Sequence, residues 1–198
     1  MDKITQVKSG VSYKRTRSHR LGILLLLSAV WFLHVATVLM AEQANEFQVK
    51  AAYLYNFGKF VEWPAGVPAS QGDSFVVCVL GTDPFGSTLD STFSNERIKG
   101  KNVLARRISK PADATSCRIL FISSSESPRL KEILAAVDKA GVLTVSDIPQ
   151  FSRVGGMIQF VVDGSKVRFE INRARAEGAG LTVSSELLKV ASVVRVNP

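Results

Sequence analysis

An apolar segment near the N-terminus decides which part of this chain can fold as a globular body. Residues 21–41, LGILLLLSAVWFLHVATVLMA, contain only three polar residues, and six basic residues precede them. A basic stretch, an apolar stretch and a small residue before a polar segment are the layout of a Sec signal peptide. We therefore predict a signal peptide at residues 1–41, cleaved after Ala41, and an exported body at residues 42–198.

The alternative is that the segment stays in place as an uncleaved signal anchor. About twenty apolar residues are enough to cross a bilayer, although the abrupt polarity of AEQANE after the segment favours cleavage. The positive-inside rule keeps the basic end in the cytoplasm in both cases. Either interpretation predicts that the body is periplasmic.

Most of the net charge of +8 belongs to this leader. Residues 1–41 hold six of the 25 basic and one of the 17 acidic residues, so 19 basic and 16 acidic residues remain in the body, a net of +3. Nucleic-acid binding requires a concentrated basic face, and this balance gives no support for it. The body is long enough for one domain with a real hydrophobic core.

Helix-like and strand-like segments alternate along the body. Helices are predicted at residues 45–62 (ended by Trp63-Pro64), after an Asp83 N-cap, at 128–141 after Ser127, and within 183–194. Strands are predicted at residues 74–81, 101–109, within 116–127, 141–147, 157–162 and 166–172. The last two flank Asp163-Gly164, which is typical of a β-hairpin. The order predicts an α/β fold: a single domain with a mixed β-sheet flanked by helices, a late β-hairpin and a C-terminal helix.

Two cysteines, Cys78 and Cys117, lie in or beside apolar strand-like segments of the exported body. An even number of cysteines in an oxidising compartment favours one disulfide. The alternative is two unrelated buried thiols, because free cysteine is common in protein cores. Their spacing excludes a CxxC redox motif.

Histidine is the most informative absence. Both histidines, His19 and His34, lie in the leader, so the body has no Ser-His-Asp triad, imidazole base or histidine-ligated zinc. The glycines of LGTDPFG at 80–86 and Gly155-Gly156 lack the spacing of a phosphate-binding loop. We therefore predict a protein that is not an enzyme, with no catalytic residue, no cofactor and no metal.

Weaker candidates for ligand binding are polar residues at strand ends. SSSES at 123–127 lies at the carboxyl end of a predicted strand, although a hydrophilic loop with an N-cap is the commoner explanation. Asp147 and Asp163 are separated acidic residues, and no spacing suggests a partner carboxylate for either. Arg168, Arg173 and Arg175 concentrate positive charge around the last predicted strand and form a candidate anion-binding site. Solvated surface arginines are the alternative.

The segment AAYLYNFGKFVEWP at 51–64 holds five aromatic residues and only two charges. At helical spacing its apolar arc is wider than docking on one sheet face requires. Aromatic residues at helical spacing are usually core residues, and the helix then packs on both the sheet and the C-terminal helix. The competing hypothesis is that Tyr53, Phe57, Phe60 and Trp63, above all Phe60 with Trp63, contribute an exposed surface for a partner or a homodimer.

Five segments together give the chain a resemblance to the YfiR-like family of exported bacterial proteins. They are KAAYLYNFGKFVEWP at 50–64, RILFIS at 118–123, LTVSD at 143–147, FSRVGGMIQFVVDGSKVRFEIN at 151–172 and AGLTVSSELLKVA at 179–191. The resemblance implies an α/β fold with a mixed sheet, and a periplasmic regulator that represses an inner-membrane diguanylate cyclase through its periplasmic domain. It also implies release by an outer-membrane OmpA-like lipoprotein.

The resemblance further implies that a disulfide stabilises the fold, a role that Cys78 and Cys117 would fill. The chain has no other cysteine, so a second, switchable disulfide is absent. The alternative function is a periplasmic sensor that binds a small molecule or anion near the three arginines and acts on a different partner.

Overall fold

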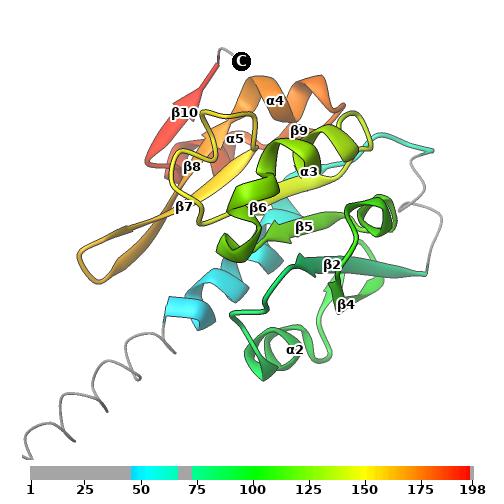
Figure 1. Cartoon of the computed structure of the whole chain (residues 1–198). Helices are drawn as coiled ribbons and strands as arrows, with labels where there is room; N and C mark the ends of the chain where they lie inside the picture. The colour runs from blue at the N-terminus through cyan, green and yellow to red at the C-terminus, as the bar shows by residue number, and fades with distance from the viewer. Residues whose placement is uncertain (1–45, 67–72, 197–198) are drawn as a thin grey trace, which may run out of the picture. The chain divides into compact units, whose positions relative to one another are not determined.

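The structure is a computed structural model that describes residues 46–66 and 73–196 (Figure 1). These residues belong to one unit, which begins at Ala44. The predicted signal peptide and its cleavage site lie outside the described residues.

A mixed sheet dominates the described part of the chain (Figure 1). Its eight strands follow the order β10-β8-β7-β6-β5-β2-β4-β3. Pairing is parallel from β4 through β7 and between β10 and β8, and antiparallel at β3–β4 and β7–β8. The strands are β2 Ser74–Leu80, β3 Arg97–Ile98, β4 Lys101–Ile108, β5 Ile119–Ile122, β6 Leu143–Ser146, β7 Ile158–Asp163, β8 Lys166–Asn172 and β10 Val193–Arg195. The predicted α/β class, mixed sheet and late hairpin are confirmed.

Two further strands, β1 Val61–Glu62 and β9 Thr182–Val183, pair with each other outside this sheet. The helical elements among the described residues are a helix at 46–60 (cyan in Figure 1), α2 Ser87–Phe93, η2 Pro111–Ser116, η3 Ser124–Arg129, α3 Leu130–Ala136, α4 Arg173–Gly178 and α5 Ser185–Val190.

The sheet is covered on both faces, because alternate residues of its central strand are buried on opposite sides. Phe75, Val77 and Val79 of β2 pack with the helix at 46–60, α2, α4 and α5. Val76, Cys78 and Leu80 pack with η2, α3 and the loop that carries Phe151. Successive residues of a strand point to opposite faces, so two apolar layers sandwich the sheet. This explains why β2 is apolar along nearly its whole length.

The aromatic helix ends at residue 60 rather than at 62 as predicted. Val61 and Glu62 form β1 and pair with Val183 and Thr182 of β9. Trp63-Pro64 was therefore the correct sign of a boundary, but a strand partner far along the chain ends the helix two residues earlier. Gly58 allows this helix to approach the sheet closely, since a Cβ there would lie 2.5 Å from Ile98 Cδ1.

Three other predicted helix boundaries were wrong. Asp83 is not an N-cap: α2 begins at Ser87 behind Gly86, and Asp83 Oδ1 instead accepts a hydrogen bond from the Phe85 N–H within a tight turn. The helix predicted at 128–141 ends at Ala136. The C-terminal helix is capped by Ser184 as a serine cap predicted, but it ends at Val190, where the chain turns to enter the sheet as β10.

Candidate functional site

Three segments singled out from the sequence follow neighbouring parallel strands. Residues 81–86 follow β2, residues 123–127 follow β5, and Asp147 follows β6. From β2 the chain crosses to β4 on one side and then returns to β5 on the other, so the connections diverge between β2 and β5. In open α/β sheets, ligands bind at the carboxyl ends of the strands at such a point. The structure thus brings these three segments to one edge of the sheet.

The crevice between β2 and β5 is, however, filled by the chain itself. Gly81 has a φ of 91°, and a Cβ there would lie 2.5 Å from Ser125 Oγ. The Thr82 N–H donates to the same hydroxyl oxygen at 3.0 Å. Ser123, not Ser127, caps the following turn by accepting from the Ser125 N–H. Internal hydrogen bonds therefore occupy groups that could otherwise bind an anion, as the capping interpretation of SSSES expected.

Lys50 links the first helix to the carboxyl end of β6. Its side chain is only 2% exposed, and Nζ lies 2.6 Å from Glu46 Oε1 and 2.8 Å from Asp147 Oδ2. The ammonium also lies 4.8 Å from the centre of the Phe47 ring. A buried ammonium is stable only where carboxylates compensate its charge, so this ion triad fixes the helix to the sheet. Asp147 Oδ1 is buried and has no hydrogen-bond partner among the described residues.

Sequence reasoning did not predict the buried role of Lys50. The spacing of Glu46 and Lys50, one helical turn apart, was the available signal. Nothing local indicated that Asp147, 97 residues away, completes the triad.

Arg107 on β4 organises a second charged cluster with all its nitrogens occupied. Nε and Nη1 donate to carboxylate oxygens of Asp83 and Asp90 at 2.8 Å each, and Nη2 donates to the Gly86 carbonyl at 2.7 Å. The hydrogen bond from Arg107 lowers the pKa of Asp90 despite its partial burial. Because each nitrogen of Arg107 already donates to a partner and two carboxylates neutralise its charge, the cluster clamps the loop before α2 onto β4 and offers little to an anion.

The predicted partner-binding aromatics divide into two groups. Phe57 is fully buried, with its ring centre 5.1 Å from that of Phe169 and 5.8 Å from that of Phe160. Tyr53 is half-buried and packs edge-on against Phe169 at 5.2 Å. The structure therefore removes Phe57 from any surface and places it in the core, where the alternative interpretation expected it.

Phe60 and Trp63, by contrast, are not fully buried. Phe60 is 38% exposed. Trp63 is half-buried: its Nε1 donates to the Arg118 carbonyl at 3.2 Å, and its ring packs edge-on against Phe75. The Arg118 guanidinium lies 5.6 Å from the centre of the Trp63 ring. A role for Phe60 and Trp63 in partner binding stays a prediction.

The three candidate arginines each pair with a different carboxylate. Arg168 lies 3.3 Å from Asp163 across the β-hairpin, Arg173 lies 2.6 Å from Glu177 within α4, and Arg175 lies 3.3 Å from Asp138. Arg173 and Arg175 lie on a short helix, which sequence reasoning did not predict, rather than on the last strand. The structure shows no shared position at which all three converge on one anion.

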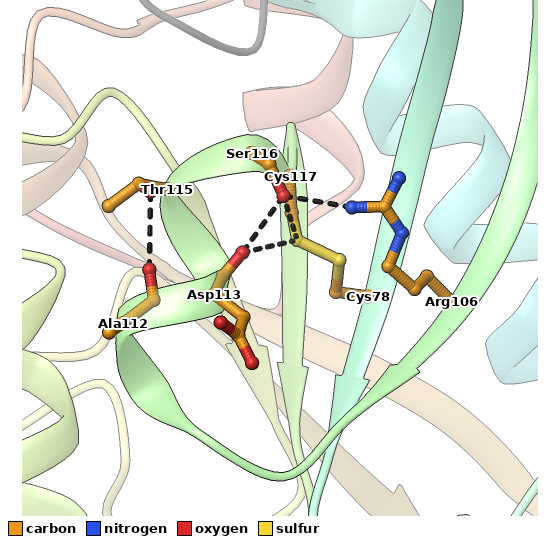
Figure 2. Close-up of a disulfide and its surroundings, with 7 residues drawn as sticks. All are labelled: Cys78, Arg106, Ala112, Asp113, Thr115, Ser116 and Cys117. Atoms are coloured by element: carbon orange, nitrogen blue, oxygen red, sulfur yellow. Dashed lines mark hydrogen bonds between the residues drawn. A yellow bond between two sulfur atoms is a disulfide. The ribbon is translucent and has the colours of Figure 1, made fainter.

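Cys78 and Cys117 form a disulfide, as predicted (Figure 2). Cys78 lies on β2 and Cys117 ends η2 just before β5, the strand beside β2. Both cysteines are fully buried. The Arg106 Nη1 donates to Ser116 Oγ at 2.9 Å beside the bridge, so β4, η2 and the bridge are tied together. The bridge staples the η2 crossover to the centre of the sheet.

The described residues offer neither a metal-binding cluster nor a helix that could span a membrane. Residues 46–66 and 73–196 contain no group of three or more His, Cys, Asp or Glu side chains arranged to hold a metal ion. None of their helices is long and apolar enough to cross a membrane.

Two solved structures resemble the chain weakly. An ABC domain from Streptococcus pneumoniae in complex with L-Trp aligns with a TM-score of 0.45 and 12% identity, over 64% of this chain and 60% of that protein. A conserved domain protein from Vibrio cholerae aligns with a TM-score of 0.45 and 13% identity, over 61% of this chain and 54% of that protein. The chain thus spans less than two thirds of either protein, and neither likeness carries an argument about function.

Comparison at the level of sequence is more informative. No curated protein matches the chain. The YfiR/HmsC-like family (DUF4154), however, matches residues 47–192, a range that includes the aromatic helix, both cysteines, the hairpin and α5. Since the match spans nearly the whole described unit, the chain belongs to the YfiR/HmsC-like family.

Proposed function

We propose that this protein represses a membrane-bound diguanylate cyclase by binding the periplasmic domain of that cyclase. The observation that carries the proposal is the family match over residues 47–192, because YfiR-like proteins are periplasmic regulators in cyclic-di-GMP signalling and not enzymes. A disulfide within the core suits an oxidising compartment. The crevice between β2 and β5, where Thr82 and Ser125 bond to each other, gives no support to a catalytic alternative.

The proposed contact surface includes Phe60, with Tyr53 and Trp63 at its margin. An exposed aromatic side chain is a common anchor of a protein interface, and Phe60 is exposed in the isolated chain. An outer-membrane OmpA-like lipoprotein would compete with the cyclase for the repressor, and a homodimer would present two such surfaces. The sensor alternative has less support, because the three candidate arginines are each paired with a separate acid.

The proposal is tested by deleting the gene and measuring cellular cyclic-di-GMP by mass spectrometry. Deletion should raise cyclic-di-GMP several-fold, and the full chain supplied in trans should restore the original level. A variant that lacks residues 1–41 should fail to do so, because it stays in the cytoplasm. A variant that cannot reach the periplasm but restores repression would contradict the proposed site of action.

Direct binding to a cyclase domain is the second test of the proposal. The periplasmic domain of each membrane-bound cyclase of the same organism is purified and titrated with the exported protein by calorimetry. One domain should bind, and Phe60→Ala should weaken that binding at least tenfold, whereas Val154→Ala, at another exposed apolar position, should not. Unchanged cyclic-di-GMP on deletion, together with no binding to any cyclase domain, overturns the proposal.

A further inference from the structure

We propose that the open edge of β4 is a docking site for an extended, acidic segment of the protein partner, which would add a strand to the sheet. The inference rests on the proposed function and names the partner's recognition element. Exposed strand edges bind extended segments through main-chain hydrogen bonds, and the neighbouring side chains select the sequence.

The edge of β4 is only partly covered in the described chain. The two-residue strand β3 pairs with Lys101 and Asn102, and the Val103 N–H donates to the Glu96 carbonyl at 3.0 Å. Glu96 is the last residue on the β3 side that bonds to β4, so β3 does not cover the part of β4 after Val103. The main-chain groups of alternate residues point to the same edge of a strand, so those of Ala105 and Arg107 also point outward. Among the described residues, these groups have no hydrogen-bond partner.

A groove runs along this edge. Its volume is about 520 Å³, and its lining includes Asp90 and Phe93 of α2, Glu96 and Arg97, and residues 102–105 of β4. Leu104 is 49% exposed, an unusual position for a large aliphatic side chain at a strand edge that is meant to stay unpaired. The edge therefore offers main-chain donors and acceptors, a groove beside them, and an apolar side chain.

The charge of this region indicates the chemistry of the occupant. Residues 97–110, RIKGKNVLARRISK, contain six basic residues and no acidic residue. Asp83 and Asp90 pair with Arg107, and Glu96 lines the groove. These three acidic residues against the six basic residues leave this region a net charge of +3. Arg106, which is exposed, lies on the same face of β4 as Leu104. Complementary charge steers association and selects partners, so an acidic segment fits this hairpin better than a neutral or basic one.

The edge also adjoins the aromatic helix. The Tyr55 hydroxyl donates to the Arg97 carbonyl of β3 at 3.4 Å, and Lys59, one turn later, lies over the Tyr55 ring. A partner that docks along β4 can therefore also reach the outer face of the helix at residues 46–60. This continuity distinguishes the β4 edge from β10, whose exposed valines lie at the other end of the strand order.

The test uses the exported protein and the cyclase domain that binds it. Ala105→Pro removes an outward N–H that makes no internal bond, a change that an edge strand tolerates, and Leu104→Glu places a negative charge beside the docked segment. Each variant should weaken binding at least tenfold, and wild-type affinity should fall as salt rises. Val162→Glu is the matched control, because Val162 is 55% exposed on the distant hairpin, and its affinity should not change.

Hydrogen exchange gives a readout that needs no substitution. The bound partner should slow exchange of the amides of Ala105 and Arg107, while the tip of the β7–β8 hairpin stays unaffected. Two outcomes overturn this inference and leave the proposed function standing. In the first, the wild-type protein binds the cyclase domain but exchange of the β4 amides is not slowed. In the second, Leu104→Glu and folded Ala105→Pro both bind the cyclase domain with wild-type affinity. If no cyclase domain binds the wild-type protein, this inference falls, and if deletion also leaves cyclic-di-GMP unchanged, the proposed function falls with it.

Discussion

Replacing Cys78 and Cys117 with alanine tests whether the disulfide stabilises the protein by restricting its unfolded chain. The cysteines are 39 residues apart. On the chain-entropy estimate, a loop of this length costs the unfolded chain about 13 cal/mol/K, which is about 4 kcal/mol at 25 °C. Loss of two buried sulfur atoms adds about 1 kcal/mol. The double variant should therefore be about 4–5 kcal/mol less stable than the oxidised protein.

Urea denaturation followed by circular dichroism measures this loss. With a urea m-value of roughly 2 kcal/mol/M for a domain of this size, the midpoint should fall by roughly 2 M, and m should rise because the uncrosslinked unfolded chain exposes more surface. Reductant should destabilise the wild-type protein by a similar amount and leave the double variant unchanged.

The burial of the disulfide also predicts how fast a reductant can cleave it. Both cysteines are fully buried, so reductant should cleave the bridge in native protein only as fast as the molecule opens. A double variant within about 1 kcal/mol of the oxidised protein, with unchanged m, would refute the entropic argument.

Three further changes test the packing and the charges. Gly58→Ala should lower the free energy of unfolding, measured by thermal denaturation, by about 1–3 kcal/mol because the new methyl group overpacks against Ile98. Gly178→Ala, which has open space around it, should leave the free energy of unfolding unchanged. Equal effects of the two substitutions would contradict this. Lys50→Ala should cost about 2–3 kcal/mol in urea, less than a fully buried pair because its carboxylates are partly exposed; a change below about 0.5 kcal/mol would count against the triad. Burial acts to raise the pKa of Glu170, but hydrogen bonds from Arg195 and Ser152 outweigh it, and the pKa is lowered from 4.5. The stability that Glu170 contributes is therefore present above about pH 4.5 and is lost as pH falls through the lowered pKa. Glu170→Gln should therefore reduce the fall in the free energy of unfolding at acidic pH. An unchanged fall in that variant would refute this.

Local patterns predicted those features whose causes lie within a short segment. The Asp163-Gly164 hairpin is one, because its turn residues and alternating strands specify the pairing of β7 with β8. The α/β class is another, since apolar strands alternate with helices along the body. The disulfide was predicted from cysteine number and compartment, although no local pattern placed β2 beside β5.

The candidate site was predictable only in part. SSSES and Asp147 were correctly placed at strand ends, but the internal bond from Thr82 that closes the crevice joins residues 43 positions apart. Phe57 and Phe60 both belong to the aromatic helix, and the sequence pattern did not distinguish them. Only the position of β7 and β8, whose Phe160 and Phe169 pack against Phe57, buries Phe57 and leaves Phe60 exposed.

The sequence by itself determined that an apolar segment at residues 21–41 precedes residues with nearly balanced charge and no histidine. It also determined that these residues alternate strand-like with helix-like segments and that the two cysteines can pair. Tertiary structure decided where the short strands β1, β3 and β10 form, because two or three residues have too little intrinsic preference to form a strand without a partner. It also decided that Lys50 is buried in an ion triad and that β4 has an open edge. These features depend on contacts between segments far apart in the chain, and no local pattern encodes such contacts.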